Sequence, residues 1–429
     1  MMESNKHRAL HFIVLAIIFG CLAVATPAFA VKAQVLYPFY GPNETVTNPV
    51  DLISDGAGNF YFADTNDNTV YKMVHDANGS WTEETLHTFN SGAGGLAVDA
   101  TGNLYGVTSF DGSYGYGSVF ELSPGSGGWT ETDLYSFNPE NGSDGWYPSA
   151  VVLDGKGNIY GTTYYGGVFQ DPYCNGFGCG TIFKLTHNPD SSWSETILYA
   201  PLFIDGAYPV SAPVLDAAGN VYGAGSEGGP SNCLSRDGGQ LGCGTIFQLS
   251  PQQDGSWTFN RIHSFQGSDG AEINAPFIID KSGNIYGTAY HGGGNVFPIC
   301  GNYFALTDCG LAFELSPQPN GQWTQTILYT FGNSPTDVLQ GNISGMDAGG
   351  NLFGYGGNGA YGLGTFWKVK PNKKGPWKED ILYSYGGFWD DVIFPEGIVV
   401  GTDGYVYGLG AIMVWPNRAA ALYEFKIKP

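Results

Sequence analysis

Residues 154–163 read DGKGNIYGTT, and variants of the first seven letters recur along the whole chain. Successive copies are between 44 residues (Asn59 to Asn103) and 67 residues (Asn284 to Asn351) apart. The seven copies begin at Asp55, Asp99, Asp154, Asp216, Asp280, Asp347 and, in the altered form GTDGYVY, Gly401. A repeat of this length built from short strands is typical of one β-propeller blade, so the sequence predicts a seven-bladed propeller.

The third copy shows how one blade is built. Residues 149–154 (SAVVLD) are an apolar run that fits an inner strand, and residues 158–164 (NIYGTTY) alternate as a second strand after a Gly-containing turn. Residues 180–185 (GTIFKL) and 193–199 (WSETILY) supply a third and a fourth strand. Four antiparallel strands make one blade, so the predicted fold class is all-β with almost no helix.

Aromatic residues repeat at fixed places in each blade. Tyr160 lies two residues after the Asn, Phe183 lies in the third strand, and Trp193 opens the fourth, with counterparts in most other copies. A bulky ring at the same place in every blade fills the wedge between neighbouring sheets. We therefore expect these rings in the core and not against a ligand.

The two ends of the chain predict how the ring closes. The seventh copy stops after its third strand, ALYEFKI, whereas residues 34–39 (QVLYPF) resemble fourth strands such as ETILYA. The N-terminal strand is predicted to complete the C-terminal blade, in a 3+1 arrangement that removes the open sheet edges. Residues 31–429 then form a single seven-bladed domain.

The first thirty residues have the pattern of a secretory signal peptide. Lys6 and Arg8 precede an apolar run at 9–25, and Ala28 and Ala30 make a small-x-small cleavage site. Residues 1–30 are therefore predicted to be removed, and the protein to be secreted to the periplasm, the cell surface or the medium, without membrane insertion afterwards. An uncleaved membrane anchor and lipidation at Cys21 are the alternatives.

The charge of the mature chain narrows the choice of partner. Loss of Glu3, Lys6 and Arg8 leaves 38 acidic and 15 basic side chains, a net charge of −23. A field of this sign repels nucleic acid and anionic membranes, so both are excluded as partners. We expect a monomer.

Strand order predicts two different faces. Loops that join second to third strands, and fourth strands to the next blade, emerge on one face, which we call the loop face. The short Asp-x-x-Gly-Asn turns lie on the opposite face, the turn face. All the long loops belong to the loop face, at 138–148, 164–179, 224–243, 289–309 and 386–395. Variable loops on a rigid scaffold commonly carry binding.

Six cysteines of the mature chain fall two by two in three of these loops. The predicted pairs are Cys174 with Cys179, Cys233 with Cys243, and Cys300 with Cys309. Local disulfides are the expected use of such pairs in an exported protein. Metal ligation is the weaker alternative, because the spacings of 5, 10 and 9 differ and no His accompanies the pairs.

Aromatic residues outside the repeat pattern gather in or beside the long loops. Such rings could stack on sugars or anchor a protein partner. The candidate binding residues are Trp146, Tyr147, Tyr165, Tyr173, Tyr303, Trp389 and Trp415. The alternative is that these rings fold inward and cover the loops.

Polar candidates lie on the same face. Asp144, Asp205 and Asp269 each precede Gly ahead of an inner strand, so their carboxylates could converge at the channel mouth and bind Ca²⁺. Asp-Gly pairs also simply form turns. His291 is the one mature His in a loop of this face. No nucleophile motif, phosphate loop or His pair is present, so no catalytic residue and no other cofactor is assigned.

The repeated phrases GNIYGTT, CGTIFKL and ETILY carry a family resemblance. Over residues 35–428 the chain resembles the GloVer tandem-repeat family of exported bacterial propellers, also known as choice-of-anchor proteins. The first copy, DGAGNFYFADTNDNTVYKM, is similar to the NHL repeat. The resemblance implies an exported propeller, and it implies no activity and no catalytic residue.

Together these features favour a secreted, non-catalytic binding module that takes a glycan or an extracellular protein through its loop face. The alternative is an extracellular lyase or hydrolase that acts on polysaccharide or peptide, and a structural role in the envelope is a third possibility. Convergent polar groups around His291 and the three Asp residues would favour an enzyme. A broad aromatic surface would favour binding.

Overall fold

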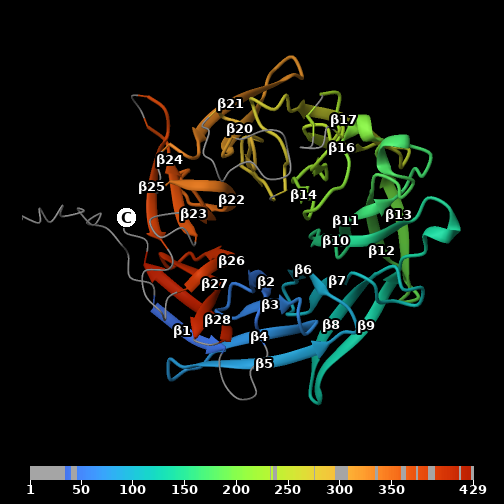
Figure 1. The fold of residues 1–429 in the computed structure, drawn as a ribbon. Helices are drawn as coiled ribbons and strands as arrows, with labels where there is room; N and C mark the ends of the chain where they lie inside the picture. The colour runs from blue at the N-terminus through green and yellow to red at the C-terminus, as the bar shows by residue number, and fades with distance from the viewer. Residues whose placement is uncertain are drawn as a thin grey trace, which may run out of the picture. The chain divides into compact units, whose positions relative to one another are not determined.

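The described strands form seven four-stranded antiparallel sheets around a ring, as Figure 1 shows for this computed structural model. The residues that the structure describes are 34–39, 46–231, 233–234, 239–274, 276–294, 308–333, 337–358, 364–372, 375–384, 392–414 and 417–426. The predicted signal peptide, residues 1–30, lies outside them. The predicted all-β, seven-bladed propeller is confirmed.

The first four blades follow the chain in order. Blade 1 consists of β2 (Pro49–Ser54), β3 (Phe60–Asp64), β4 (Thr69–His75) and β5 (Trp81–Thr88). Blade 2 consists of β6 (Ala93–Val98), β7 (Leu104–Thr108), β8 (Ser118–Gly125) and β9 (Gly128–Ser136). Blade 3 consists of β10 (Gly145–Leu153), β11 (Ile159–Gly166), β12 (Thr181–His187) and β13 (Trp193–Tyr199). Blade 4 consists of β14 (Val214–Leu215), β15 (Val221–Gly225), β16 (Thr245–Pro251) and β17 (Trp257–Ser264).

The last three blades complete the ring. Blade 5 consists of β18 (Ile278–Ile279), β19 (Ile285–Ala289), β20 (Leu311–Pro317) and β21 (Trp323–Thr330). Blade 6 consists of β22 (Val338–Met346), β23 (Leu352–Asn358), β24 (Thr365–Lys370) and β25 (Lys378–Ser384). Blade 7 consists of β26 (Val392–Val400), β27 (Tyr405–Val414), β28 (Asn417–Lys426) and β1 (Gln34–Phe39).

Blade 7 joins the two ends of the propeller. Its strand order is β1-β28-β27-β26, and β1 pairs antiparallel with β28 from Gln34 opposite Glu424 to Phe39 opposite Ala420. Figure 1 shows the blue β1 beside the red β28. Phe39 is fully buried, and its ring lies 5.3 Å from that of Phe62 in blade 1. The N-terminal strand thus occupies the fourth-strand position that its sequence predicts.

The repeated Asp-x-x-Gly-Asn phrase forms the same turn in each described copy. Asp154 Oδ1 accepts hydrogen bonds from the N–H groups of Lys156 (2.8 Å) and Asn158 (2.9 Å), and Asn158 Nδ2 donates to Asp154 Oδ2 (2.7 Å). Gly157 has φ 82°, a conformation that favours Gly. Burial opposes ionisation, but these hydrogen bonds hold the pKa of Asp154 below its ordinary value. The same bonds recur at Asp55, Asp99, Asp216, Asp280 and Asp347.

The repeated aromatic residues pack between blades, as the sequence predicts. Tyr160 and Leu198 of blade 3 share one buried cluster with Phe247 of blade 4, and Trp257 packs against it. Gly161 lies under the ring of Phe183, where an added Cβ would collide with the ring. In blades 2 to 7 the Gly after the second-strand aromatic therefore makes room for the third-strand ring, whereas blade 1 has Phe62 there, stacked on Tyr71.

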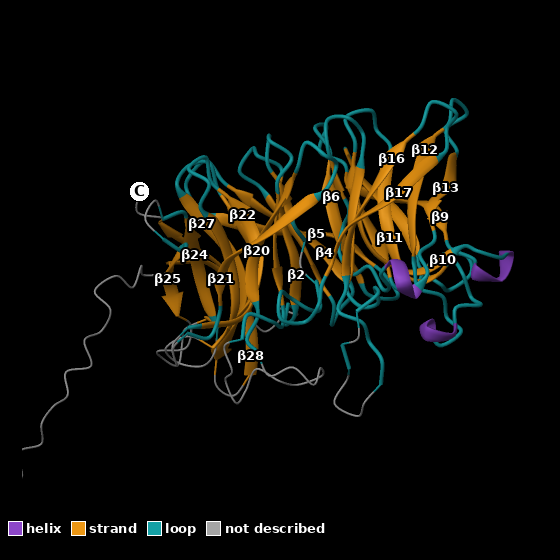
Figure 2. Cartoon of the chain, turned by 90° about the horizontal axis from the view of Figure 1, so that it is seen from above, coloured by secondary structure: helices purple, strands orange, loops and turns teal. Residues whose placement is uncertain are grey.

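The two faces differ as expected. Figure 2 shows short turns along one side of the ring, and the described 3-10 helices on the other. These are η1 (Pro139–Asn141), η2 (Pro172–Cys174) and η3 (Phe203–Asp205). η1 and η2 interrupt two of the long loops of the loop face, and η3 lies in the connection from β13 to β14, which strand order also assigns to the loop face. Within the described part of the chain, no helix is long and apolar enough to cross a membrane.

Candidate functional site

Disulfides close two of the long loops on the loop face. Cys174 bonds to Cys179 and Cys233 bonds to Cys243, with Cα–Cα distances of 5.3 and 5.1 Å. These two predicted pairings are confirmed. Cys309 is also disulfide-bonded, and its predicted partner, Cys300, lies outside the described residues.

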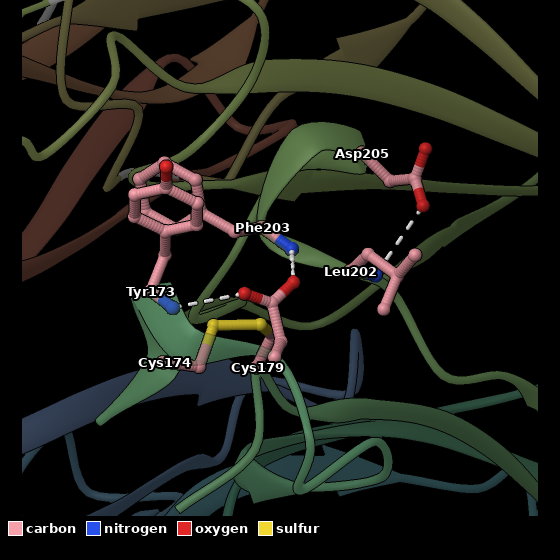
Figure 3. The surroundings of a disulfide bond; sticks show 7 residues. Tyr173, Cys174, Cys179, Leu202, Phe203 and Asp205 are labelled. Carbon is pink, nitrogen blue, oxygen red and sulfur yellow. Dashed lines mark hydrogen bonds between the residues drawn. A yellow bond between two sulfur atoms is a disulfide. The ribbon is translucent and has the colours of Figure 1, made fainter. Parts of the chain in front are cut away.

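An exposed ring, Tyr173, lies next to the first of these disulfides (Figure 3). Asp171 Oδ1 accepts from the Tyr173 N–H (2.9 Å), and its Oδ2 accepts from the Phe203 N–H at the start of the next blade (2.8 Å). The rings of Tyr173 and Phe203 stack with centroids 5.2 Å apart. The predicted site residue Tyr173 is therefore held in place although it is 55% exposed.

The same loop contains the one group of three potential metal ligands found among the described residues. The group consists of Asp171, Cys174 and Cys179. Because a metal-binding cysteine supplies a thiolate, and both sulfur atoms here are used in a disulfide, the group is not a metal site.

One residue in each of blades 3 to 6 has a left-handed backbone, either near the start of the inner strand or in the segment that leads into it. The φ angles of these residues are 53 to 60°. Each N–H donates across the blade boundary, over 2.9 to 3.2 Å, to a carbonyl oxygen of the preceding blade. The pairs, donor first, are Tyr147 with Tyr116, Tyr208 with Cys179, Glu272 with Cys243, and Gln340 with Cys309. We call these four donors the arc residues.

The arc residues have a strained backbone conformation that hydrogen bonds to the preceding blade stabilise. A left-handed conformation is uncommon outside Gly and is a clear outlier for a bulky residue such as Tyr, and strain of this kind concentrates at functional sites. Three of the four acceptor carbonyls belong to disulfide-bonded cysteines. Each of these disulfides therefore helps to fix the carbonyl that holds the arc residue of the next blade.

A second row of side chains lies opposite the arc in blades 3 to 5. The residue before each arc residue pairs across the sheet with one member of this row. The pairs are Trp146 with Tyr165, Ala207 with Glu227, and Ala271 with His291. We call Tyr165, Glu227 and His291 the second row. The backbone arrangement is the same in the three blades, whereas the side chain is aromatic, acidic and imidazole in turn.

Blade 3 gathers the aromatic members of both rows into one cluster. Trp146 stacks on Tyr165 with centroids 4.5 Å apart, and Tyr147 lies 6.3 Å from Tyr165. Tyr164 lies 4.6 Å from Tyr165 and stacks on Tyr208 of blade 4 at 4.9 Å. The structure thus brings together three predicted residues, Trp146, Tyr147 and Tyr165.

Two exposed rings border this cluster. Phe110 lies 5.2 Å from Tyr147 and is 53% exposed, and Phe177 lies 5.5 Å from Tyr165 and is 50% exposed. Sequence reasoning did not select Phe110 or Tyr208 as site residues. The repeated Tyr-Pro of WYP and AYP was the signal for Tyr208.

In blades 4 and 5 the arc and the second row contain acidic side chains, Glu272 in the arc and Glu227 in the second row. Glu272 Oε2 lies 3.5 Å from His291 Nε2, and Glu272 Oε1 accepts a hydrogen bond from Asn274 Nδ2 (2.6 Å). His291 Nδ1 lies 3.2 Å from the carbonyl oxygen of Asp308. Burial, and then the negative charge of Glu272, raise the pKa of Glu227 to about 7. Glu227 and Glu272 were not selected from the sequence.

The three predicted Asp residues are used by their own turns. Their carboxylates accept from backbone N–H groups just after the fourth strand, at Asn138 (2.7 Å), Leu202 (3.3 Å) and Gln266 (2.6 Å). Each also contacts a fourth-strand side chain, in the pairs Asp144 with Tyr135 (3.1 Å), Asp205 with Tyr199 (2.9 Å) and Asp269 with His263 (3.3 Å). Among the described residues these oxygens belong to no group of three ligand atoms within 4.8 Å of one another, and a calcium site at the channel mouth stays a prediction.

A cavity of about 430 Å³ lies where the seven inner strands meet. Every blade contributes to its lining, through residues that include Asp51, Gly95, Ser149, Ser211, Asn274, Asn342 and Gly397. Asp51 is the one charged lining residue among those described, and its Oδ2 accepts from the Gly95 N–H (2.6 Å). Burial between the cavity walls raises the pKa of Asp51, although this hydrogen bond opposes the shift. An acid within the apolar strand PVDLIS was the signal for this residue.

Three candidate residues and one cysteine are not placed. Tyr303, Trp389, Trp415 and Cys300 lie outside the described residues.

The chain matches a known repeat family over part of its length. Residues 48–233 match the Gloeobacter/Verrucomicrobia repeat family. The resemblance that the repeated phrases predict is therefore confirmed for these residues. No curated protein matches the chain.

Several solved structures share the fold. The hydrazine synthase of Kuenenia stuttgartiensis has a TM-score of 0.53 at 12% identity, over 92% of this chain and 97% of that one. A streptogramin B lyase structure has a TM-score of 0.50 at 14% identity, over 91% of this chain and 97% of that one. A puromycin hydrolase has a TM-score of 0.52 at 12% identity, over 92% of this chain and 55% of that one. At these identities the likeness shows the propeller fold alone.

Proposed function

We propose that this protein is an exported, monomeric propeller that binds a glycan through the loop face of blades 3 to 5 without catalysing a reaction. The observation that carries the proposal is the cluster formed by Trp146, Tyr147 and Tyr165. These rings are half-buried, held by neighbouring rings, and bordered by the exposed Phe110 and Phe177. Rigid, partly exposed rings bind with little loss of conformational entropy.

A glycan fits this face better than a protein does. A sugar ring presents an apolar C–H face that stacks on an aromatic ring and hydroxyl groups that bond to phenol and carboxylate oxygens. A standard protein interface buries about 800 Å² on each partner around a well-packed apolar centre. The large exposed apolar side chains of this face are instead divided between two places: Phe110 and Phe177 border the aromatic cluster, and Tyr173, Leu202 and Ile204 line a pocket beside Phe203.

Export is supported by independent features of the chain. Two disulfides close loops of the propeller, and disulfides persist in oxidising compartments. The N-terminal sequence has the basic, apolar and small-residue segments of a secretory leader. These features support a binding face outside the cytoplasm, where polysaccharides are accessible.

A glycan-array screen of residues 31–429, with and without EDTA, tests the proposal. We expect saturable binding that is unaffected by EDTA, and loss of at least tenfold in affinity for Phe177→Ala and for Tyr165→Ala, since stacked rings are typical binding hot spots. Ile327→Ala is the matched control, because Ile327 is 43% exposed on the outer strand of blade 5. Equal losses in the control, or binding to no glycan, would contradict the proposal and direct the search to protein partners. Loss of binding in EDTA would indicate a calcium requirement.

A hydrolase or lyase is the second candidate. The observation in its favour is the pair Glu227 and Glu272 beside His291, because a carboxyl with a pKa near 7 can act as a general acid. The same screen reads this alternative through cleavage products. Turnover that Glu227→Gln abolishes would establish the enzyme and overturn the non-catalytic proposal.

A further inference from the structure

We infer that the glycan bound by this face carries free, protonated amino groups, which are recognised by Glu227 and Glu272 next to the aromatic cluster. The inference rests on the proposed function and adds the chemical class of the ligand. It is carried by the geometry of the two rows and by the sign of the charges around them.

The two glutamates continue the aromatic cluster without a break. Tyr164 of the cluster stacks on Tyr208, the arc residue of blade 4. The backbone N–H of Ala207, next to Tyr208, donates to the carbonyl oxygen of Glu227 (2.9 Å). Gly228, next to Glu227, pairs with Gly242, and the carbonyl oxygen of the neighbouring Cys243 accepts from the Glu272 N–H (3.2 Å). A chain of sugar rings lying along the arc from blade 3 would therefore reach the carboxylates in blades 4 and 5.

The glutamates are held in a defined position and remain open to solvent. Asn274 and His291 both contact the Glu272 carboxylate, whose side chain is 21% exposed. Glu227 is half-buried. Among the described ion pairs, none joins either glutamate to a Lys or an Arg. Partly desolvated carboxylates without such a partner favour a cationic group in the ligand.

The described residues of the surrounding face include acidic side chains but no Lys or Arg. The described loop-face segments of blades 3 to 5 are 138–148, 164–180, 200–210, 224–231, 233–234, 239–244, 265–274, 289–294 and 308–310. Eight acidic residues and no Lys or Arg occur in them, the acids being Glu140, Asp144, Asp171, Asp205, Glu227, Asp269, Glu272 and Asp308. Arg236 lies outside the described residues, and Arg261, on the outer strand β17, pairs with Asp205 at 3.7 Å. The field over the two rows therefore attracts cations.

A protonated amine fits better than a metal ion. The ligand atoms of Glu227, Glu272 and His291 do not all come within 4.8 Å of one another in the described structure. A preformed metal site needs its ligand atoms around a single point. A sugar ammonium group has three N–H donors, and it can bond to carboxylate oxygens that are farther apart.

Two oligosaccharides that differ only in this group test the inference. Binding of the β-1,4-linked hexamers of glucosamine and of N-acetylglucosamine is measured by calorimetry for the wild type, Glu227→Gln and Glu272→Gln. We expect the wild type to prefer the amine by roughly tenfold, and each variant to lose most of that preference, since charge-assisted hydrogen bonds are about twice as strong as neutral ones. Affinity for the acetylated hexamer should stay within about twofold of the wild type in both variants.

Glu195→Gln is the matched control. Glu195 is another carboxyl whose pKa burial raises to about 7, but it lies on β13, where it contacts Tyr135 of blade 2. This variant should keep the wild-type preference, and thermal melts show that all variants fold. Equal affinity of the wild type for both hexamers, failure of the glucosamine hexamer to bind, or an unchanged preference in both Glu variants would overturn the inference. Binding of neutral glycans in the array would then still support the proposed function, whereas binding to no glycan would remove both.

Discussion

The turn face and the loop face differ in what recurs from blade to blade. On the turn face, the same residues make the same hydrogen bonds from blade to blade, as Asp154 and Asn158 show. On the loop face of blades 3 to 6, the backbone repeats through a left-handed residue bonded to the preceding blade, but its side chain changes. The arc carries Tyr147, Tyr208, Glu272 and Gln340.

This difference separates structure from recognition. A side chain that recurs with the same hydrogen-bond partner in successive blades indicates a role in the stability of the fold, because every blade needs it equally. A backbone conformation that recurs with different side chains indicates a scaffold that presents a different functional group in each blade. The second row follows the same rule, with Tyr165, Glu227 and His291 at matching places in three blades. We therefore assign stability to the turn face and binding to the loop face.

The largest expected effect is a change in the pH dependence of stability, which differs in sign between Glu195 and the turn-face residue Asp154. Burial, and then the charge of Asp144, raise the pKa of Glu195 from 4.5 to about 7, whereas hydrogen bonds lower the pKa of Asp154 on the turn face despite its partial burial. Folded protein therefore keeps a proton on Glu195 that the unfolded chain releases. The contribution of Glu195 to stability is greatest below about pH 4.5 and falls as the pH rises through 7, by about 2–3 kcal/mol in total.

Urea unfolding of the wild type and Glu195→Gln between pH 4.5 and 8 measures this contribution. The variant should be the more stable protein at pH 8, and the difference should shrink towards pH 4.5. Asp154→Asn should be less stable than the wild type throughout this pH range, because a carboxyl with a lowered pKa stabilises the folded protein at pH values above its ordinary pKa of 3.8. This contribution is lost only as the pH falls below 3.8, which an additional series at lower pH would measure. If the free energy of unfolding depended on pH in the same way for the wild type and for Glu195→Gln, the raised pKa of Glu195 would be contradicted.

Removal of a disulfide breaks the loop face specifically. The double variant Cys174→Ser, Cys179→Ser should lose about 2 kcal/mol of stability, the value expected for so short a loop. The carbonyl of Cys179 holds the N–H of Tyr208, so glycan binding should weaken as well. Denaturant unfolding and a binding titration measure the two effects. Unchanged glycan affinity in a folded variant would show that the disulfide does not position the arc.

Removal of a repeated turn carboxylate breaks the turn face specifically. Asp154→Ala removes the acceptor of two backbone N–H bonds and one side-chain bond, and should reduce the free energy of unfolding by about 1.5 kcal/mol. Glycan affinity should remain that of the wild type. Asp216→Ala, at the same place in blade 4, should behave alike. A binding defect without a stability defect would reverse the assignment of the two faces.

The smallest effect concerns an exception on the turn face. Ser191 has φ 69° at a turn position where other blades have Gly79, Gly255 and Gly321. Ser191→Gly should raise stability by about 0.5–1 kcal/mol, because the left-handed strain is relieved and the residue is exposed. Thermal melting measures the gain, and glycan binding should not change. Destabilisation would show that the Ser191 side chain has a structural role of its own.

The sequence predicts the frame well because the frame repeats. The blade number, the strand order and two disulfides follow from Asp-x-x-Gly-Asn phrases, recurring aromatic residues and paired cysteines. The aromatic half of the candidate site follows too, since Trp146, Tyr147 and Tyr165 stand outside the repeat. These residues were found because they break a pattern.

The acidic half of the site was missed for a physical reason. Loops of unequal length separate the rows, so Glu227 and Glu272 do not align with Tyr165 and Tyr147 by eye, and only the backbone pairing shows that they correspond. The Asp-Gly pair at Asp144 fits a carboxylate that faces the channel as well as one that caps its own turn, and the structure shows this carboxylate accepting from the Asn138 N–H of that turn. The correspondence of loop residues between blades and the direction of a carboxylate depend on contacts within and between blades. A single sequence does not show those contacts.

Hydroxyl-radical footprinting of the mature protein, with and without a glycan that binds in the array, tests most directly whether the loop face is the binding surface. Ligand should protect Phe110, Tyr173 and Phe177, and leave Trp193 and Trp257 unchanged where the fourth strands begin at the turn face. Protection of Trp193 and Trp257, with the loop-face rings still fully reactive, would contradict the account.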